Sequence, residues 1–354
     1  MSDSVIQAKY IHMADVLRER IQQDRNSDRL PSIRSMMKRY GVSQSTITSA
    51  LNILESEGLI ARKGGSGVYA TQSNRPITIC FCRTIEANYR IDKWEYALHQ
   101  GCNNRGWHLA TSRFAADKVE LFSDAVDADA YVVTPDFVNF QSPLLNNLTS
   151  SHIPIVVLGR DTGGARLDFV AKDNNAIIQE YVQGLVTRGH RKLAFLDCEP
   201  PFHEVKQRVD CFERACRLLN IESSIVLDVG AKYGSDSLTA SAEFLRKYLS
   251  TLNGGSLPFT ALLSSSASGS IPAIRVFNDA GYRVPQDLSL CCLGSDSRSI
   301  YAVPTITNTV HNHEESADAI LQIIDKRLNG DSSPLLYKWI NYQIEWRDSV
   351  TTLN

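Results

Sequence analysis

Small hydroxyl and amide side chains recur at helical spacing shortly after residue 43. Four of them lie at i, i+3, i+4 and i+7, on one face of a helix: Ser45, Thr48, Ser49 and Asn52. Such groups donate and accept hydrogen bonds, and base edges in a DNA major groove offer partners for both. Basic residues that can neutralise phosphates lie close by: Arg34, Lys38, Arg39, Arg62 and Lys63. This stretch therefore has the side-chain chemistry for contacts to DNA.

Two short helices and a hairpin would have to position these side chains. Ser32 is placed to cap the first helix, Gly41 to end it in the left-handed conformation, and Ser43 to cap the second. The second helix would be buried through its opposite, apolar face: Ile47, Ala50, Leu51 and Leu54. Strand-like runs at 59–62 and 67–70 predict a hairpin, or wing, with Gly65 in its tip. A helix at about 9–23 would complete the core.

The same residues form a series of motifs, which are P-S-x-R from Pro31, G-V-S-x-S-T-x-x-x-A-L from Gly41, L-x-x-E-G-L-I from Leu54 and G-x-G-V-Y from Gly65. In these motifs roughly residues 1–70 resemble the winged helix-turn-helix of the GntR family of bacterial transcription regulators. The family commonly has arginines where this chain has Gln44 and Thr48, so we expect different base contacts. The resemblance implies that these residues contact DNA: Ser32, Arg34, Ser43, Gln44, Ser45, Thr46, Thr48, Ser49, Arg62, Lys63 and Gly65. A helical packing unit with a solvated polar face is the alternative.

Charge is distributed unevenly along the 354 residues. The net charge is −2, yet residues 1–75 carry 11 Lys and Arg against 7 Asp and Glu, or +4, which leaves −6 for the remainder. A basic first part is what nucleic-acid binding requires. No long apolar run and no signal-peptide pattern are present, so we expect a soluble, cytoplasmic chain without membrane contact. The 8 cysteines then suit reduced, partly buried thiols.

From residue 77 onward, apolar strand runs alternate with amphipathic helical stretches. Strands are expected at 77–81, 108–111, 130–133, 155–158, 192–196, 224–229, 261–263 and 288–293, and helices at 94–105, 174–188, 204–219, 235–252 and 268–280. This alternation is typical of doubly wound parallel sheets covered on both faces, in an α/β protein. The chain would divide into a winged helix-turn-helix domain (1–72), a linker (73–76) and a larger α/β domain (77–354).

The second part carries its own motifs: F-V-x-x-D-N from Phe169, G-H-R-K-L-A-F-L from Gly189, R-x-x-x-F from Arg208, G-Y-R-V-P-Q-D-L-S from Gly281 and G-x-D from Gly294. They resemble the effector-binding body of the LacI/GalR family over about residues 76–345, which implies that residues 77–354 form an effector-binding and dimerisation domain. The resemblance implies a periplasmic-binding-protein-like fold with a ligand cleft between two lobes and three crossings, near 173, 303–305 and 332–334. Lobe 1 would hold about 77–172 and 305–332, and lobe 2 about 173–303 and 333–354. Such a head and body are similar to those of arabinose-type repressors.

Several expected strands are followed by polar residues, where ligands bind in open α/β sheets. These candidates are Asp173, Arg208, Ser266 and Asp296. By resemblance, Asp173, Arg208 and Asp296 match the family's effector-contacting Asp, Arg and Asp. Carboxylates and a guanidinium can each hold vicinal hydroxyls, which favours a sugar or sugar-like polyol.

Two aromatic residues after the first strand of this part, Tyr89 and Trp94, would stack on the apolar face of such a ligand. The family usually has Asn-Asp where this chain has Ser266-Ala267. The effector is therefore expected to be smaller, less hydroxylated or differently charged than a hexose.

No catalytic constellation, metal site or cofactor motif is found. The pair His311-x-His313 is read as a helix start, and Gly189 as a helix stop. We therefore expect a transcription regulator, as a repressor, that binds a palindromic operator as a homodimer and responds to a sugar-like effector; a tetramer-forming heptad after Trp346 is missing. The alternatives are a ligand-free dimerisation scaffold and a non-sugar effector. An enzyme or transport-type binding protein with an accessory head is less consistent with these motifs.

Overall fold

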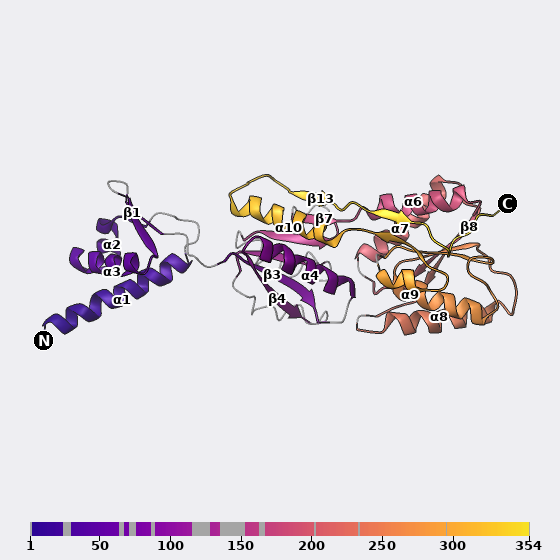
Figure 1. The fold of residues 1–354 in the computed structure, drawn as a ribbon, viewed down its shortest axis with the longest axis horizontal. Helices are drawn as coiled ribbons and strands as arrows, with labels where there is room; N and C mark the ends of the chain where they lie inside the picture. The colour runs from indigo at the N-terminus through magenta and orange to yellow at the C-terminus, as the bar shows by residue number, and fades with distance from the viewer. Residues whose placement is uncertain are drawn as a thin grey trace. The chain divides into compact units, whose positions relative to one another are not determined.

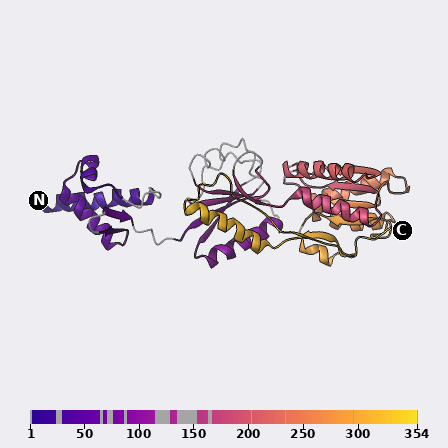
Figure 2. The same ribbon diagram turned by 90° about the horizontal axis from the view of Figure 1, so that it is seen from above.

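The computed structural model divides the chain into two compact units, the head (Met1–Pro76) and the body (Ile77–Asn354). The described residues are all except 1, 24–29, 64–66, 71–75, 86–88, 115–127, 135–152, 163–166, 202, 233, 295 and 354. The elements of each unit can be followed by label in Figure 1 and by colour in Figure 2.

The head is a three-helix bundle with a two-stranded wing. Its helices are α1 (Ser2–Gln23), α2 (Ile33–Tyr40) and α3 (Gln44–Ser56), and its strands β1 (Ile60–Lys63) and β2 (Gly67–Ala70) pair antiparallel. One core unites the three helices, and its fully buried members include Leu17, Met36, Ile47, Leu51 and Leu54. Helix α1 begins earlier than the expected residue 9, because apolar periodicity marks only the part of a helix that packs against a core.

The body contains two six-stranded sheets, and each sheet forms the centre of one lobe. In lobe 1 the order is β13-β7-β6-β5-β3-β4, and every pair is parallel. The strands of lobe 1 are β3 (Thr78–Thr84), β4 (His108–Phe114), β5 (Ala130–Val133), β6 (Ile155–Gly159), β7 (Asp168–Ala171) and β13 (Tyr337–Trp339). In lobe 2 the order is β14-β12-β11-β10-β8-β9, with β14 alone antiparallel to its neighbour. The strands of lobe 2 are β8 (Lys192–Asp197), β9 (Ser223–Asp228), β10 (Ala261–Ser264), β11 (Ser289–Cys292), β12 (Thr307–Val310) and β14 (Gln343–Glu345).

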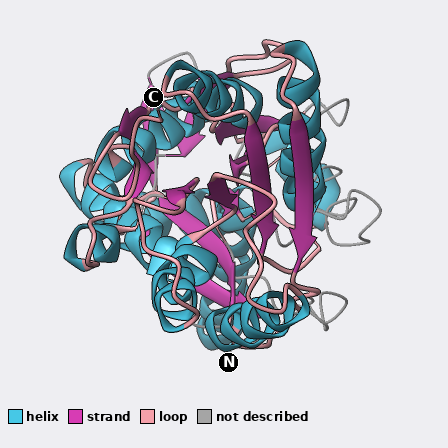
Figure 3. Ribbon diagram, turned by 90° about the vertical axis from the view of Figure 1, so that its right-hand side faces the viewer, coloured by secondary structure: helices cyan, strands magenta, loops and turns pink. Residues whose placement is uncertain are grey.

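Helices cover these sheets. In lobe 2, α8 (Ser237–Thr251) and α9 (Ala267–Asp279) pack on one face, and α6 (Asn174–Thr187) and α7 (His203–Leu218) on the other (Figure 1). In lobe 1, α4 (Tyr89–Asn104) and α10 (His313–Leu328) lie side by side over one face. Helices flank the strands in the end view as well (Figure 3). The predicted α/β fold with a helical head and parallel sheets is confirmed.

Four strands of the body were not expected: β7, β12, β13 and β14. Strand β12 has the sequence Thr-Asn-Thr-Val, so no apolar run marks it, yet Thr307 and Asn308 are buried. Their polar atoms find partners, since the Thr307 N–H donates to Ser349 Oγ (2.9 Å) and the Arg347 N–H donates to Thr307 Oγ1 (2.8 Å). Strand β13 is a three-residue edge strand with exposed side chains. Patterns of apolar residues miss both kinds of strand.

These strands correct two of the three expected crossings between the lobes. The first crossing follows β7 and lies near Asp173, as expected. Strand β12 pairs in lobe 2 whereas α10 packs on lobe 1, so the second crossing lies between Val310 and His313 and not at 303–305. Strand β13 pairs in lobe 1 and β14 in lobe 2, so the third lies between Trp339 and Gln343 and not at 332–334.

All 8 cysteines are buried and unpaired, as expected for reduced thiols. The Cys80 and Cys82 sulfurs lie 3.8 Å apart on β3. Among the described residues no helix combines the length and apolarity that a membrane crossing needs, and no three His, Cys, Asp or Glu side chains gather where a metal ion would bind.

Candidate functional site

Three small residues fix where α2 begins, where it ends and where α3 begins. Ser32 Oγ accepts a hydrogen bond from the Ser35 N–H, and Ser43 Oγ accepts one from the Thr46 N–H, both at 3.2 Å. Gly41 has φ of 64°, and its N–H donates to Met37 O at 2.9 Å. Glycine adopts this left-handed conformation without steric cost. The two predicted caps and the predicted helix stop are confirmed.

Helix α3 has one buried and one outward face. Ile47, Ala50, Leu51 and Leu54 are completely buried, so the hydroxyl and amide face points away from the head's core. On that face Gln44 is exposed, and Thr48 and Ser49 are half-buried. The hydroxyls of Ser45 and Thr46 each lie 2.8 Å from Ser43 Oγ, so the N-cap orients both.

Basic side chains flank this face in two different states. Arg34, Lys38 and Arg39 of α2 are exposed, and within the described part of the head Arg34 forms no ion pair. In contrast, Arg62 of β1 donates to Asn52 Oδ1 at 2.5 Å and lies 3.3 Å from Glu55 Oε2. Arg62 is thus bound to α3 and would have to exchange these partners for a phosphate. Lys63 ends β1 opposite Gly67, and Gly65 lies outside the described residues.

In the body, three of the predicted effector residues are connected through their chain neighbours. Asp173 caps α6 by accepting from the Ala176 N–H at 2.9 Å. Ser266 caps α9 by accepting from the Ser268 N–H at 3.2 Å. Arg208 of α7 is 8% exposed, with Nε 3.4 Å from Asn174 Oδ1 and Nη1 3.4 Å from Ser265 O. Arg208 therefore bridges the two caps at the carboxyl ends of the lobe 2 strands.

Asp296 is held in a separate cluster. Its carboxylate forms a two-pronged ion pair with Arg298, and its backbone oxygen accepts from Asn308 Nδ2 at 3.3 Å. Burial alone raises the pKa of Asp296, but hydrogen bonds from the Arg298 side chain and backbone bring that pKa below its usual value. Asp296 is thus ionised and already paired, and no hydrogen bond joins it to Arg208 in the described part of the body.

The two aromatic residues predicted to stack on a ligand have different outcomes. Tyr89 is the first residue of α4, and its side chain lies outside the described set. Trp94 is buried, 5% exposed, in the lobe 1 core. Its ring packs against His311 and His313, with centroids 5.8 Å and 5.2 Å away. The stacking role predicted for Trp94 is therefore wrong, because helix α10 and the segment before it cover the ring.

The sequence did not predict a role for Asp197 or Arg83, which both lie at carboxyl ends of strands. Arg83 is 4% exposed and its Nη1 lies 2.6 Å from both Asp92 and Glu95 carboxylates. Asp197 ends β8, and its Oδ1 is buried without a hydrogen-bond partner among the described residues. Burial raises the pKa of Asp197 to about 6. A charged residue directly after the apolar run from Leu193 to Leu196 was the available signal.

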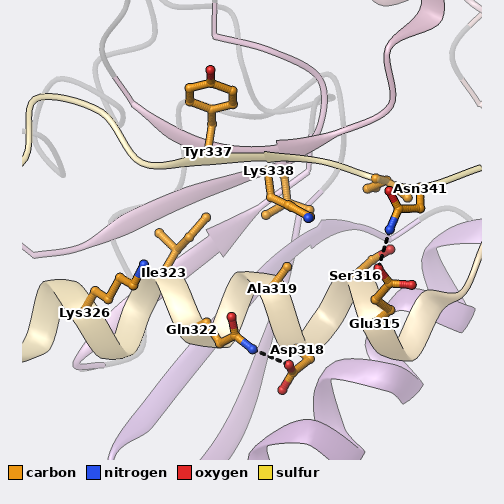
Figure 4. A pocket seen from close by; sticks show the side chains of 12 residues that line it. Glu315, Ser316, Asp318, Ala319, Gln322, Ile323, Lys326, Tyr337, Lys338 and Asn341 are labelled. Carbon is orange, nitrogen blue, oxygen red and sulfur yellow. Dashed lines mark hydrogen bonds between the residues drawn. The ribbon is translucent and has the colours of Figure 1, made fainter.

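A cavity of about 280 Å³ lies elsewhere, between α10 and the edge strand β13 of lobe 1 (Figure 4). Its polar lining groups bond partly to one another. Asn341 Nδ2 donates to Glu315 Oε1 at 2.7 Å, and Gln322 Nε2 donates to Asp318 Oδ2 at 2.5 Å. None of the predicted effector residues lines this cavity.

Two family models match this chain. Residues 9–70 match the model for bacterial regulatory proteins of the gntR family, and residues 182–350 match the periplasmic binding protein-like domain. The HTH-type transcriptional regulator AglR of Rhizobium meliloti is 27% identical over 73% of this chain and 76% of its own. The HTH-type transcriptional repressor PurR of Mannheimia succiniciproducens is 22% identical over 84% and 92%. The regulator YjiR of Escherichia coli is 34% identical, but this chain spans only 20% of its length.

Solved structures show the same body fold. A LacI family regulator, CCPA from Weissella paramesenteroides with bound sucrose, aligns with a TM-score of 0.66 at 17% identity, over 78% of this chain and 100% of that one. The lac repressor dimer bound to operator aligns at 0.64 and 13% identity, over 79% and 96%. The chain thus carries a segment that matches the gntR-family model, followed by a body that matches the periplasmic binding protein-like model and has the fold of solved LacI family regulators, and its similar proteins are transcriptional regulators.

Proposed function

We propose that this protein is a transcriptional repressor that binds a two-fold symmetric operator as a homodimer, under the control of a sugar or sugar-like effector. The observation that carries this proposal is the polar outer face of α3 beside a wing, in a chain whose body has the LacI-family fold. A helix of this kind fits a major groove and reads base edges through hydroxyl and amide groups.

On DNA, the N-terminal half of α3 would lie in the major groove with Gln44, Thr48 and Ser49 towards the bases. Arg34, Lys38 and Arg39 would lie along the phosphates, and the wing would add Lys63 and Gly65. Ser43 would hold Ser45 and Thr46 in fixed orientations, as their 2.8 Å contacts indicate. Contacts from these side chains would then select sequence, while the arginines and lysines supply affinity.

A dimer is supported by an exposed apolar segment in lobe 2. Ile300, Tyr301 and Val303 are 44%, 80% and 86% exposed within four consecutive residues. Large apolar side chains clustered on a surface are typical of protein-protein interfaces. Two-fold pairing would also place two recognition helices in register on a palindromic site. The lac repressor, whose solved structure shares the body fold, forms a dimer bound to operator.

The effector is proposed to bind at the carboxyl ends of the lobe 2 strands. Arg208 is buried there between Asn174 and Ser265, and Asp173 and Ser266 cap the adjoining helices. A buried guanidinium next to hydroxyl and carboxylate groups suits a polyhydroxylated ligand. Neighbouring LacI family regulators were solved with bound sucrose, glucose and ribose, which supports sugars as the first compounds to test.

A thermal-shift screen of sucrose, glucose, ribose and their acidic and amino derivatives tests the effector proposal. A binder of the folded state raises the melting temperature, and we expect at least one compound to do so. Arg208→Ala should remove that shift, whereas Arg214→Ala, on the same helix but outside the site, should retain it. If no compound shifts the wild type, the sugar assignment fails, and a non-sugar effector or a ligand-free dimerisation scaffold takes its place.

A further inference from the structure

Asp197 carries a buried carboxylate oxygen that accepts no hydrogen bond from the described residues. Oδ1 is inaccessible to solvent and has no hydrogen-bond partner among the described residues, while the Glu199 backbone N–H stabilises the carboxylate. An unpaired oxygen in the interior costs folding free energy, and proteins rarely keep one without a reason. A ligand that supplies the missing donor would be such a reason.

The surroundings of Asp197 coincide with the proposed effector site. In the pairing of β8 with β10, Leu196 lies opposite Ser264. The residues that follow these two are Asp197 and Ser265, which therefore lie side by side. Ser265 O is the atom that accepts from Arg208 Nη1, and Ser265 Oγ accepts from the Cys198 N–H at 3.0 Å. Asp197 therefore lies at the same sheet edge as Arg208 and the Ser266 cap.

The charged groups that act on Asp197 do not neutralise it. Burial is the largest influence and raises the pKa of Asp197; the charges of Asp228 and Glu199 raise it further, and among the charges only that of Arg208 lowers it. Asp228 stands opposite Asp197 in the β8–β9 register, but its own Oδ1 is engaged with the Gly230 N–H at 2.7 Å. Among the described residues at this edge, Asp197 thus has a carboxylate oxygen that is both buried and without a hydrogen-bond partner.

We infer that Asp197 is a specificity-determining residue of the effector site, where it accepts a hydrogen bond from a hydroxyl group of a sugar-class ligand. This inference rests on the proposed function. Position 267 is alanine and brings no carboxylate to α9, and the Asp296 carboxylate is bound to Arg298. Asp197 supplies the missing acceptor from the adjacent strand, at a different angle to the ligand, so it also selects which hydroxyl configuration fits.

Binding measurements on three proteins test this role. Wild type, Asp197→Asn and Asp228→Asn are titrated at pH 7.5 with the panel sugar that most stabilises the wild type. Asn keeps the shape of Asp but loses the charge, so Asp197→Asn should weaken binding roughly 10- to 100-fold, the worth of a hydrogen bond to a charged group. Asp228→Asn, the matched control, should stay within about twofold. Asp197→Asn should also change the ranking of glucose, ribose and sucrose.

The outcomes separate this inference from the proposed function. If the wild type binds a sugar and Asp197→Asn binds it with unchanged affinity and ranking, Asp197 is not a ligand contact, although the effector site remains. If no sugar in the panel binds the wild type, the sugar-effector proposal fails and this role for Asp197 fails with it. A melting curve at pH 7.5 checks that each variant is folded.

Discussion

Arg298 donates two hydrogen bonds to the carboxylate of Asp296, from Nη2 to Oδ2 at 2.6 Å and from Nε to Oδ1 at 3.0 Å. The Asp296 side chain is 10% exposed and that of Arg298 52%. Asp296, which was predicted to contact a ligand, is therefore already paired with Arg298, two residues along the chain. A ligand would have to displace Arg298 or use the pair as a unit.

Arg298→Ala should destabilise the protein by about 1 kcal/mol at pH 7, because a mostly buried carboxylate loses its charged partner. The lowered pKa of Asp296 means that the pair stabilises the fold above the unfolded value of 3.8, and that this stability is lost as the pH falls through the lower folded pKa. The difference from wild type in urea unfolding should therefore shrink towards pH 3. Arg275→Ala, which removes an exposed helix pair with Asp279, should be nearly neutral; equal losses in both variants would contradict this reading.

Asp197→Asn should stabilise the ligand-free protein at pH 8. The pKa of Asp197 is raised from 3.8 to about 6 by burial. The wild type therefore loses stability as the pH rises from 3.8, where the carboxyl of the unfolded chain ionises, to about 6, where the buried carboxyl ionises too. Each pKa unit is about 1.4 kcal/mol, so the gain at pH 8 should be roughly 1–3 kcal/mol. The gain should disappear near pH 4. If the melting-temperature difference between Asp197→Asn and wild type is constant from pH 4 to pH 8, the pKa of Asp197 is not raised by folding.

Arg34→Ala should weaken binding to operator and to unrelated DNA by similar factors. Arg34 is exposed on α2 and is assigned to a phosphate, so its loss should reduce the slope of log affinity against log salt by about one. Thr48→Ala should instead reduce the preference for operator and leave unrelated DNA unaffected. Fluorescence anisotropy over a salt series measures both quantities. Unchanged operator binding by Arg34→Ala at moderate salt would exclude the proposed docking.

Tyr301→Glu should shift the protein towards monomers. Tyr301 is 80% exposed beside Ile300 and Val303, and a charge at the centre of an apolar contact is costly to bury. Light scattering at micromolar concentration should report a dimer for wild type and a lower mass for the variant. Leu218→Glu, at an isolated exposed leucine, is the control and should remain dimeric. A monomeric wild type would remove the dimer from the proposal.

The head was predictable from sequence because its signals are local. Ser32, Gly41 and Ser43 act on backbone groups within a few residues, so local residue types fix where α2 begins and ends and where α3 begins. The buried side of α3 follows equally from a period of 3.6 residues. What the sequence did not reveal is that Arg62 binds Asn52 and Glu55, because that contact depends on how the wing folds over α3.

In the body, most strands with buried apolar side chains were predicted correctly, whereas a strand with buried polar side chains was missed. Strand β12 is held by Thr307, Asn308 and their partners near the C-terminus, which are contacts between distant parts of the chain. Asp197 was missed for the same reason, because its place in the proposed effector site depends on its proximity to Arg208 and on the pairing of β8 with β10. Trp94 was misassigned because sequence spacing cannot tell an aromatic ring that faces a ligand from one covered by α10.

Selection of bound duplexes from a randomised DNA library by the full-length protein tests whether it is a dimeric, sugar-controlled operator-binding protein. We expect enrichment of an inverted repeat with two equal half-sites about one helical turn apart, bound by two chains. We also expect the stabilising sugar to change the yield of that sequence. Recovery of no common sequence, or of a single half-site bound by one chain whatever sugar is present, would show that the protein is not a sugar-controlled dimeric repressor.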